Sequence, residues 1–365
     1  MWKETKLQGK KCVLRSIAAA VLGVTYIGGA QAQSSVTLFG VLDGGLLYTN
    51  KTLDATTGGN AGKQLGLVDG QSYFSQFGLI GTEDLGGGYK AKFKLMSGFS
   101  FANGGFDHCN GNLFGCEAWV AVDGALGQLK LGLQYSPFFT AIYDSDPRGL
   151  SLFGSGAVML VDNVGGTGVF NANAVSYTSP VVAGLQASVM YAFGGVAGNF
   201  QAGRQYSASV KYQLGGLSII SSIYDGNGGG TIQTAIPTTV QYEGRMLGVG
   251  YQFGALTAKV SFVNYKVAGS FNNNVYGGGV SWYVMPTLDL NGGVWVTSDR
   301  NQSSNRSTLV AFGANYLLSK ATSLYGQVGV VNNHGKMNTG LSLSGALYGV
   351  EGTTVGAVVG IRHTF

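Results

Sequence analysis

Short segments in which every second residue is apolar recur along most of this chain, and each ends in a cluster of Gly, Asn or Asp. Successive side chains of a β-strand point to opposite faces of its sheet, so this period of two predicts strands. About sixteen such segments can be delimited, an even number. They are residues 36–48, 72–83, 89–99, 116–122, 129–135, 173–179, 185–193, 205–214, 217–224, 239–253, 256–267, 274–283, 287–297, 307–317, 323–331 and 354–365.

The lengths and connections of these segments indicate a membrane barrel. A tilted strand that crosses a bilayer needs about 9–11 residues, which suits most of them. Short turns alternate with long connections, the long ones being residues 50–70, 100–115, 137–172, 225–238 and 332–352. Because hydrocarbon cannot satisfy free backbone groups, a spanning sheet must close on itself. We therefore predict an all-β fold, a 16-stranded antiparallel transmembrane β-barrel with long external loops, in which segment 36–48 pairs with segment 354–365 and both ends lie on the periplasmic side.

Composition excludes the main alternatives. The chain has 62 Gly in 365 residues, and Gly costs about 1 kcal/mol relative to Ala at a helical position. Only 11% of the residues are charged, which is low for a disordered chain, and 5 Pro are too few for collagen. A soluble propeller would require a repeat of about 40–50 residues, and the sequence shows none.

The first 32 residues have the organisation of an export signal. A basic start is followed by an apolar stretch at 17–30 and then by Ala-Gln-Ala at 30–32, a pattern that signal peptidase cleaves. The rival interpretation is a membrane anchor, but a spanning helix needs about 20 apolar residues. We expect a signal peptide at 1–32 and one barrel domain at 33–365.

Charge and histidine content exclude other function classes. Most of the net charge of +5 comes from residues 1–32, and the remaining chain has 17 basic and 16 acidic residues. A nucleic-acid partner is therefore not expected. The three histidines are His108, His334 and His363, and nothing around them resembles a catalytic triad or a metal cluster. We expect no enzyme activity, no cofactor and no metal site.

Several segments resemble the trimeric general porins of Gram-negative bacteria, especially the β-proteobacterial branch. The residues that carry the resemblance are 34–43 (SSVTLFGVLD), 77–79 (FGL) followed by 81–88 (GTEDLGGG), 173–180 (NAVSYTSP) and 360–365 (GIRHTF). The resemblance spans the chain after the export signal and implies a sixteen-stranded barrel, a homotrimer in outer-membrane lipid, and a role for the terminal Phe365 as the signal that the barrel-assembly machinery reads.

The resemblance also implies that the third external loop folds into the lumen as a constriction. Here that loop is 137–172, which carries Asp144, Asp146, Arg148 and Asp162. The alternative is a loop that stays outside the barrel. Asp43 and Gln76, on the first two strands, are assigned to the pore lining with them.

The sequence departs from the family at the cationic wall that usually faces this loop. Gln76 and Ile80 stand where the family often has Arg, as do Cys116 and Leu133. Lys90, Lys92 and Lys94 alternate with apolar residues and so share one face of the third strand. A lysine facing lipid near the midplane costs about 2–4 kcal/mol, so we place them on the lumenal face. In this hypothesis the lysines form a substitute positive wall that faces Asp144, Asp146 and Asp162. Lys90 directly follows a turn, so Lys92 and Lys94 are the better candidates, and a weak anion preference follows.

Cys109 and Cys116 are the two cysteines that remain after the export signal, with six residues between them, several of which are turn formers. Export permits disulfides, so we expect a bond within this loop. The alternative is two reduced thiols, with Cys116 occupying a former Arg position on the wall.

Two function classes remain. The first is an outer-membrane porin for passive diffusion of ions and small hydrophilic solutes through a water-filled barrel. The second is a solute-selective outer-membrane channel, in which constriction residues bind a solute. An adhesin is a weaker third class, because barrels of that kind are smaller and have no open lumen, whereas sixteen strands enclose an aqueous channel.

Overall fold

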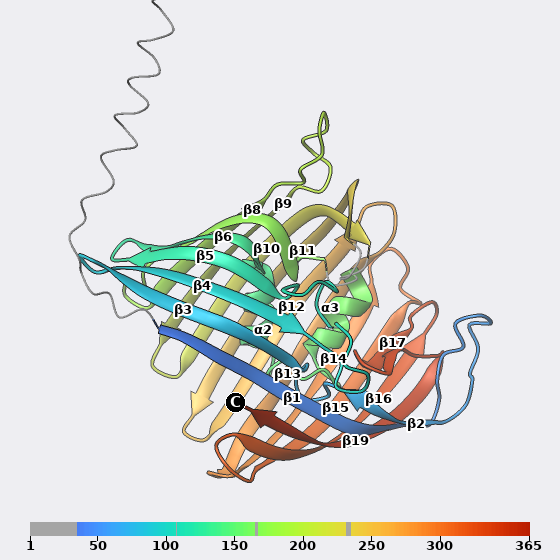
Figure 1. The fold of residues 1–365 in the computed structure, drawn as a ribbon. Coiled ribbons are helices and arrows are strands. Elements are labelled where there is room, and N and C mark those ends of the chain that lie inside the picture. Colours follow the sequence, from blue (N-terminus) through green and yellow to red (C-terminus); the bar gives the residue numbers. More distant parts are fainter. Residues whose placement is uncertain (1–34, 107, 165–166, 231–234) are drawn as a thin grey trace, which may run out of the picture.

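The structure is a computed structural model that describes residues 35–106, 108–164, 167–230 and 235–365. One antiparallel sheet contains seventeen of its strands and curls into a barrel (Figure 1). These strands are β1 (Ser35–Thr49), β2 (Gln64–Asp69), β3 (Gln76–Gly86), β4 (Tyr89–Gly98), β5 (Glu117–Gly124), β6 (Gly127–Tyr135), β7 (Phe170–Thr178), β8 (Leu185–Ala192), β9 (Gln205–Leu214), β10 (Leu217–Gly230), β11 (Ala235–Phe253), β12 (Leu256–Val267), β13 (Asn272–Met285), β14 (Leu288–Asp299), β15 (Arg306–Leu317), β16 (Thr322–His334) and β19 (Gly352–Thr364). The predicted signal segment 1–32 lies outside the described residues.

The seventeen strands fill sixteen positions, which confirms the predicted barrel. β2 and β3 both pair with β1, β3 along its first half and β2 along its second, so together they form one interrupted strand position. The prediction of one continuous strand at 72–83 is wrong, because residues 70–75 leave the ladder between them. Their backbone N–H groups turn instead toward the Asp43 carboxylate, which accepts hydrogen bonds from Gln71, Ser72 and Tyr73.

The barrel closes between its first and last strands, as predicted. β1 pairs with β19 in a register that runs from Val41 opposite Thr364 to Thr49 opposite Gly356. Beyond this register, Gly40 and Phe365 exchange both backbone hydrogen bonds, at 2.9 and 3.1 Å. No edge of the sheet is left free along this seam, which is the condition for crossing hydrocarbon.

Short and long connections occupy opposite rims. The short turns are residues 87–88, 125–126, 179–184, 215–216, 254–255, 286–287 and 318–321. They share a rim with the start of β1 and with Phe365, so both ends of the barrel lie there, the periplasmic rim in the predicted topology (Figure 1). Most of the long connection predicted at 225–238 is instead strand, because the glycines of β10 pair with β11 through a bulge near Gly226.

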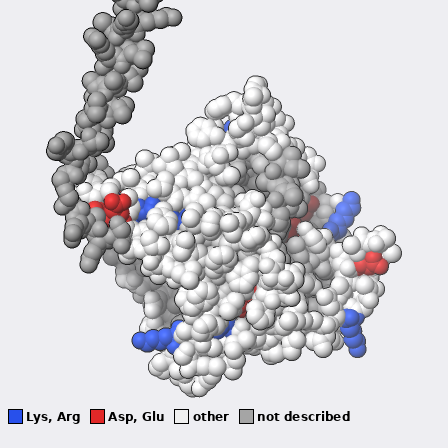
Figure 2. Space-filling view, in the orientation of Figure 1, with Lys and Arg blue, Asp and Glu red and all other residues white. Residues whose placement is uncertain are grey.

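The outer surface of the barrel is apolar. Outward residues of several strands remain exposed although they are large and hydrophobic, for example Leu38 at 60%, Phe312 at 60% and Val359 at 60%. The visible face carries few charged side chains, and most of these lie toward its margins (Figure 2). Such a surface suits lipid and would aggregate in water.

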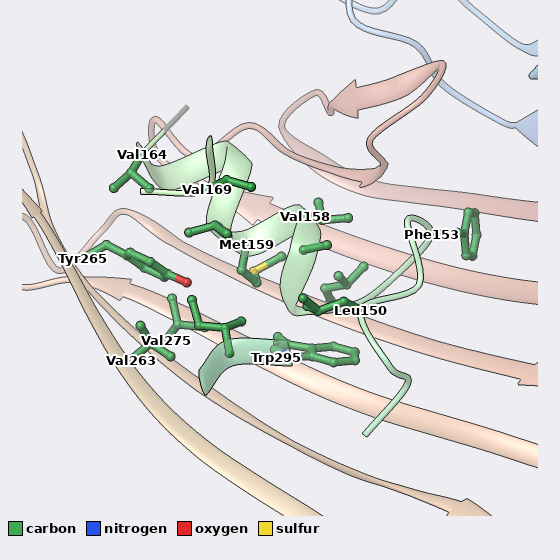
Figure 3. Packing of buried hydrophobic residues seen from close by; sticks show 14 of the residues in the cluster. Leu150, Phe153, Val158, Met159, Val164, Val169, Val263, Tyr265, Val275 and Trp295 are labelled. Atoms are coloured by element: carbon green, nitrogen blue, oxygen red, sulfur yellow. The ribbon is translucent and has the colours of Figure 1, made fainter. Parts of the chain in front are cut away.

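The lumen is partly filled by the connection between β6 and β7, which contains helices α2 (Pro137–Ser145) and α3 (Gly156–Val164). Val158 and Met159 of α3 are both buried, and Met159 packs toward Val263, Val275 and Trp295 on the inner faces of β12–β14 (Figure 3). This third external loop therefore folds inward, and the alternative of a loop outside the barrel is excluded. Among the described residues, neither helix is long and apolar enough to cross a membrane.

A second external connection contacts the segment that leads into α3. Between β16 and β19 the chain forms a small hairpin of β17 (Thr339–Ser342) and β18 (Ala346–Tyr348). Gly154, just before α3, donates to the backbone oxygen of Leu341, and Leu343 donates to that of Leu152. The two loops thus support each other inside the mouth of the barrel.

Candidate pore constriction

A strip of lysines runs along the lumenal face of β4. Lys92 and Lys94 lie opposite Ala121 and Trp119 of β5 on the inner face, while the alternate residues of β5, such as Val120, are exposed to lipid. Each lysine pairs with an acid of β5. Lys92 pairs with Asp123, and Lys94 Nζ lies 3.0 Å from Glu117 Oε1.

Other lumenal cations near this strip form no ion pair within the described part of the chain. Lys130 of β6 lies over the Trp119 ring, 4.8 Å from its centroid, a cation–π contact. Arg362 of β19 is half-buried and forms no ion pair within the described part of the chain. Lys90 shares the face of Lys92 but lies next to the turn at 87–88, where it is exposed.

Helix α2 carries the acidic side of the in-folded loop. Its start is capped by Ser136, whose hydroxyl accepts from the backbone N–H of Phe139, with Pro137 at the first helical position. Asp144, near its end, forms an ion pair at 2.7 Å with Lys211 on the inner face of β9. Asp144 is thus neutralised by the barrel wall on its own side of the lumen.

Asp146 and Arg148 are buried in the turn that follows α2. The Asp146 carboxylate accepts from the backbone N–H groups of Arg148, Leu150 and Gly156, so it organises the turn and the start of α3. Burial raises the pKa of Asp146 above its usual value, and these N–H donors oppose that rise.

The Arg148 guanidinium fastens this turn to the barrel wall. It donates to Asn291 of β14 at 2.9 Å, to the backbone oxygens of Phe153 and Gly154, and to Gln327 of β16. Burial lowers the pKa of Arg148 to about 10, which still leaves it charged at neutral pH. The assignment of Asp146 and Arg148 to the pore lining is corrected, because both are enclosed by protein, with exposed fractions of 3% and 7%.

Asp162 joins α3 to the β17–β18 hairpin. Its Oδ2 accepts from the Thr339 hydroxyl at 2.9 Å, whereas its Oδ1 is buried and without a hydrogen-bond partner in the described structure. Burial raises the pKa of Asp162 to about 6. This carboxyl therefore holds two loops together and does not face the lysine strip.

Asp43 and Gln76 also differ from their predicted roles. Asp43 is fully buried, and its carboxylate accepts from Tyr325 and from the backbone of segment 70–75. Gln76 is 7% exposed, and its Oε1 has no hydrogen-bond partner among the described residues. The pore-lining assignment of Asp43 is wrong, because that segment covers it, and Gln76 is largely covered as well.

A disulfide joins Cys109 and Cys116, whose Cα atoms are 4.9 Å apart. Both cysteines are buried against Met96, and Phe74, Tyr135 and Phe170 pack on this cluster. The loop between β4 and β5 is thereby held against the inner wall.

The structure thus brings the predicted residues together only in part. No ion pair joins Lys92 or Lys94 to Asp144, Asp146 or Asp162 within the described residues. The acidic partners of the lysines, Glu117 and Asp123, were not predicted. The alternation of residues 117–123 could have indicated them, because it places both acids on the same face as Trp119. Also missed were Lys130, Lys211 and Arg362. A group of three or more His, Cys, Asp or Glu side chains able to hold a metal is not found in the described part.

Comparisons with known proteins agree with this architecture. Residues 18–336 match the family described as Gram-negative porin. The chain is similar to outer membrane porin protein 32 of Delftia acidovorans, with 31% identity over 96% of this chain and 99% of that protein. It is also similar to an outer membrane porin protein of Bordetella pertussis, with 28% identity over 96% of this chain and 100% of that protein.

Solved structures show the same barrel. An anion-selective porin from Comamonas acidovorans superposes with a TM-score of 0.77 and 27% identity, covering 91% of this chain and 100% of that one. The fold of OmpT of Vibrio cholerae, solved in a trimer form, matches with a TM-score of 0.64 at 14% identity, covering 91% of this chain and 99% of that one. With the closed sixteen-position barrel and its in-folded loop, these matches show that the chain belongs to the Gram-negative porin family and is a non-enzymatic, general diffusion channel of the outer membrane.

Proposed function

We propose that the diffusion path for ions and small hydrophilic solutes runs between the in-folded loop and the wall that carries the lysine strip of β4 and Lys130 of β6, and that it weakly prefers anions. The observation that carries this proposal is that two lumenal cations form no ion pair, whereas the acids of the in-folded loop are paired or enclosed. Lys130 and Arg362 form no ion pair among the described residues and lie on the lumenal face of the barrel. The loop acids are instead paired with Lys211, in the case of Asp144, or enclosed, in the case of Asp146.

The selectivity is measured as the reversal potential of the purified protein in planar bilayers under a KCl gradient. Replacing Lys130 and Arg362 by Gln removes two lumenal charges and shifts the reversal potential toward cations. The matched control is Lys63→Gln with Lys320→Gln, which removes the same charge from an external loop and a turn. Equal shifts in both variants would contradict a lumenal origin of the preference. High salt reduces the preference, because the Debye length falls to about 3 Å at 1 M.

The relative from Comamonas acidovorans is described as anion-selective, which supports this assignment. The observation that favours the second function class, a solute-selective channel, is a cavity in the mouth of the barrel.

The assembly state is a further part of the proposal. The chain forms a homotrimer in outer-membrane lipid, in agreement with the trimer form of the outer membrane protein OmpT of Vibrio cholerae. Light scattering of the detergent-solubilised protein, corrected for bound detergent, gives three times the chain mass if this is correct and a single chain mass if it is not.

Export and insertion complete the proposal. Signal peptidase removes residues 1–32, and the barrel-assembly machinery inserts a chain that begins at Gln33. N-terminal sequencing of the protein from outer membranes tests the cleavage site, and an intact first residue would contradict it.

A further inference from the structure

A cavity of about 720 Å³ lies in the mouth of the barrel. Its walls come from segment 70–75, from the loop between β4 and β5, from the in-folded loop and from the β17–β18 hairpin. Pockets that bind small molecules commonly measure about 300–1,000 Å³. A single-ring solute therefore fits with room for some of its water.

The cavity has an aromatic wall. Tyr73 and Phe74 stack with ring centroids 4.9 Å apart and an interplanar angle of 15°. Tyr135 contacts Phe139 at 4.9 Å and Phe170 at 5.7 Å. Both groups line the same space, so a flat ring that enters it meets aromatic faces and edges from three parts of the chain. Ring pairs prefer such offset and tilted arrangements.

The cavity carries almost no free charge. Its lining includes no Lys, Arg or Glu among the described residues, and its only carboxylate, Asp69, pairs with His108. An ion gains nothing from this surface, because the wall offers it no opposite charge in exchange for its water. Polar contacts come from hydroxyl groups, such as those of Tyr143 and Tyr348.

The wall is not simply a packed core. Tyr143 and Tyr348 line the cavity and yet are each 45% exposed, from α2 and β18 respectively. Aromatic rings that only fill a core are covered by their neighbours, whereas Tyr143 and Tyr348 lie at the open side of the cavity. In a chain that conducts solutes, this surface lies on the way to the lumen.

We infer that this cavity is a binding site for uncharged, single-ring aromatic solutes. The inference rests on the proposed diffusion path and adds a substrate class to it. Rings collect on the aromatic wall, hydroxyl groups of the solute bond to the tyrosines at the opening, and the solute then passes the lysine strip by diffusion. Ions and sugars pass without being retained.

The test measures ion current through the full protein in planar bilayers while benzyl alcohol is titrated. The expected result is a saturable fall in current. Cyclohexylmethanol has a similar size without an aromatic face and should block roughly 3- to 10-fold more weakly. Benzoate, which is charged, should also block more weakly, and glucose should give no saturable block.

Two variants localise the effect. Phe139→Leu keeps an apolar side chain but removes a ring, and should raise the half-blocking concentration roughly 3- to 10-fold. Its control is Phe200→Leu, on an exposed loop, which should leave that concentration unchanged.

Ala102→Trp fills the cavity from an exposed position and should remove the block while ion conduction continues. Its control is Ala268→Trp, on an exposed turn away from the cavity.

The possible outcomes distinguish a failure of the aromatic binding site from a failure of the proposed diffusion channel. Normal ion conduction without saturable block by benzyl alcohol overturns the aromatic site and leaves the diffusion channel standing. Stronger block by benzoate, or equal block in Phe139→Leu and the parent protein, overturns the site as well. A folded protein that conducts no ions contradicts the diffusion path itself, and binding of benzyl alcohol followed by tyrosine fluorescence then still decides the inference.

Discussion

Lys94 of β4 donates to Glu117 of β5 across the lumenal face of the barrel, with Nζ and Oε1 3.0 Å apart. The two side chains are 22% and 9% exposed, and the ammonium also lies 5.4 Å from the centroid of the Phe39 ring. A cation that is paired in this way contributes little net field to a passing ion. What it does is keep the carboxylate of Glu117 neutralised.

The first prediction follows from this pairing. Lys92→Gln with Lys94→Gln leaves Asp123 and Glu117 without their partners, and the reversal potential should move toward cations. The companion variant also carries Asp123→Asn and Glu117→Gln, so both ion pairs are removed while the net charge of the protein stays the same. It should restore most of the parent selectivity. If the first variant keeps the parent value, these lysines do not act on the diffusion path.

The second prediction concerns Arg148, which bonds the in-folded loop to β14 and β16. Arg148→Ala leaves several buried acceptors without donors, and each such group costs about 1–3 kcal/mol. The loop should leave the wall, and single-channel conductance should rise. Arg204→Ala, on an exposed loop, is the control and should leave conductance unchanged. Unchanged conductance in a folded Arg148→Ala barrel would show that the loop is held by its apolar face alone.

The third prediction is a pH dependence of α3. The pKa of Asp162 is about 6 in the folded loop and near 3.8 when unfolded, so the docked loop binds an extra proton between these values. Docking is therefore strongest below about pH 4, weakens as the pH rises through 6 and is constant above. The difference corresponds to about 3 kcal/mol at most.

Asp162→Asn mimics the protonated side chain and can still accept from Thr339. Hydrogen exchange in 156–164 should be slower in this variant than in the parent at pH 7.5, and the two should agree near pH 4. Faster exchange in the variant at pH 7.5 would show that the carboxylate is favourable where it lies.

The fourth prediction concerns the seam. A Cβ at Gly40 would overlap the Phe365 ring and lie 2.9 Å from the backbone oxygen of Gln76, whereas a Cβ at Gly66 would meet nothing within 4 Å. Gly40→Ala should therefore lower the fraction of folded barrel on refolding, and Gly66→Ala should not. The folded fraction is measured by the mobility shift between unheated and heated samples on a denaturing gel. Equal yields for both variants would indicate that the Phe365 ring and the backbone at Gln76 both give way freely.

The fifth prediction concerns the disulfide. Mass spectrometry without reductant should find Cys109 and Cys116 resistant to alkylation, and a pair of free thiols would contradict the bond. Replacing both by Ser should destabilise the protein by about 2–3 kcal/mol, as expected for so short a loop. Because Phe74 and Tyr135 pack on the cysteines, the same change should also weaken any block by benzyl alcohol.

The sequence predicts the barrel better than it predicts the constriction. Alternation along a strand decides which side chains face lipid, so the lumenal position of Lys92 and Lys94 follows from residues 89–95 alone. Their partners do not, because Asp123 and Glu117 come into contact only through the register between β4 and β5. Burial within the lumen is harder still. Asp43 alternates like a lumenal residue, but segment 70–75 covers it, and that depends on where the second strand position breaks.

Helices in the third loop were also not predicted. Residues 156–164 form a nine-residue run that begins with Gly and is mostly apolar, and so short a run has too little intrinsic helicity to stand out. Its helix is stabilised by the inner wall of β12 and β13, which belongs to a distant part of the sequence.

The pairing of β1 with β19 constrains the order in which the barrel folds. These strands are the first and the last of the sheet, so they cannot close the barrel by pairing with each other until all the strands between them are in place. Any partly built sheet has two edges with unpaired backbone groups, and such edges readily recruit strands from other copies. Ring closure within one chain therefore competes with association between chains until the last strand is in place.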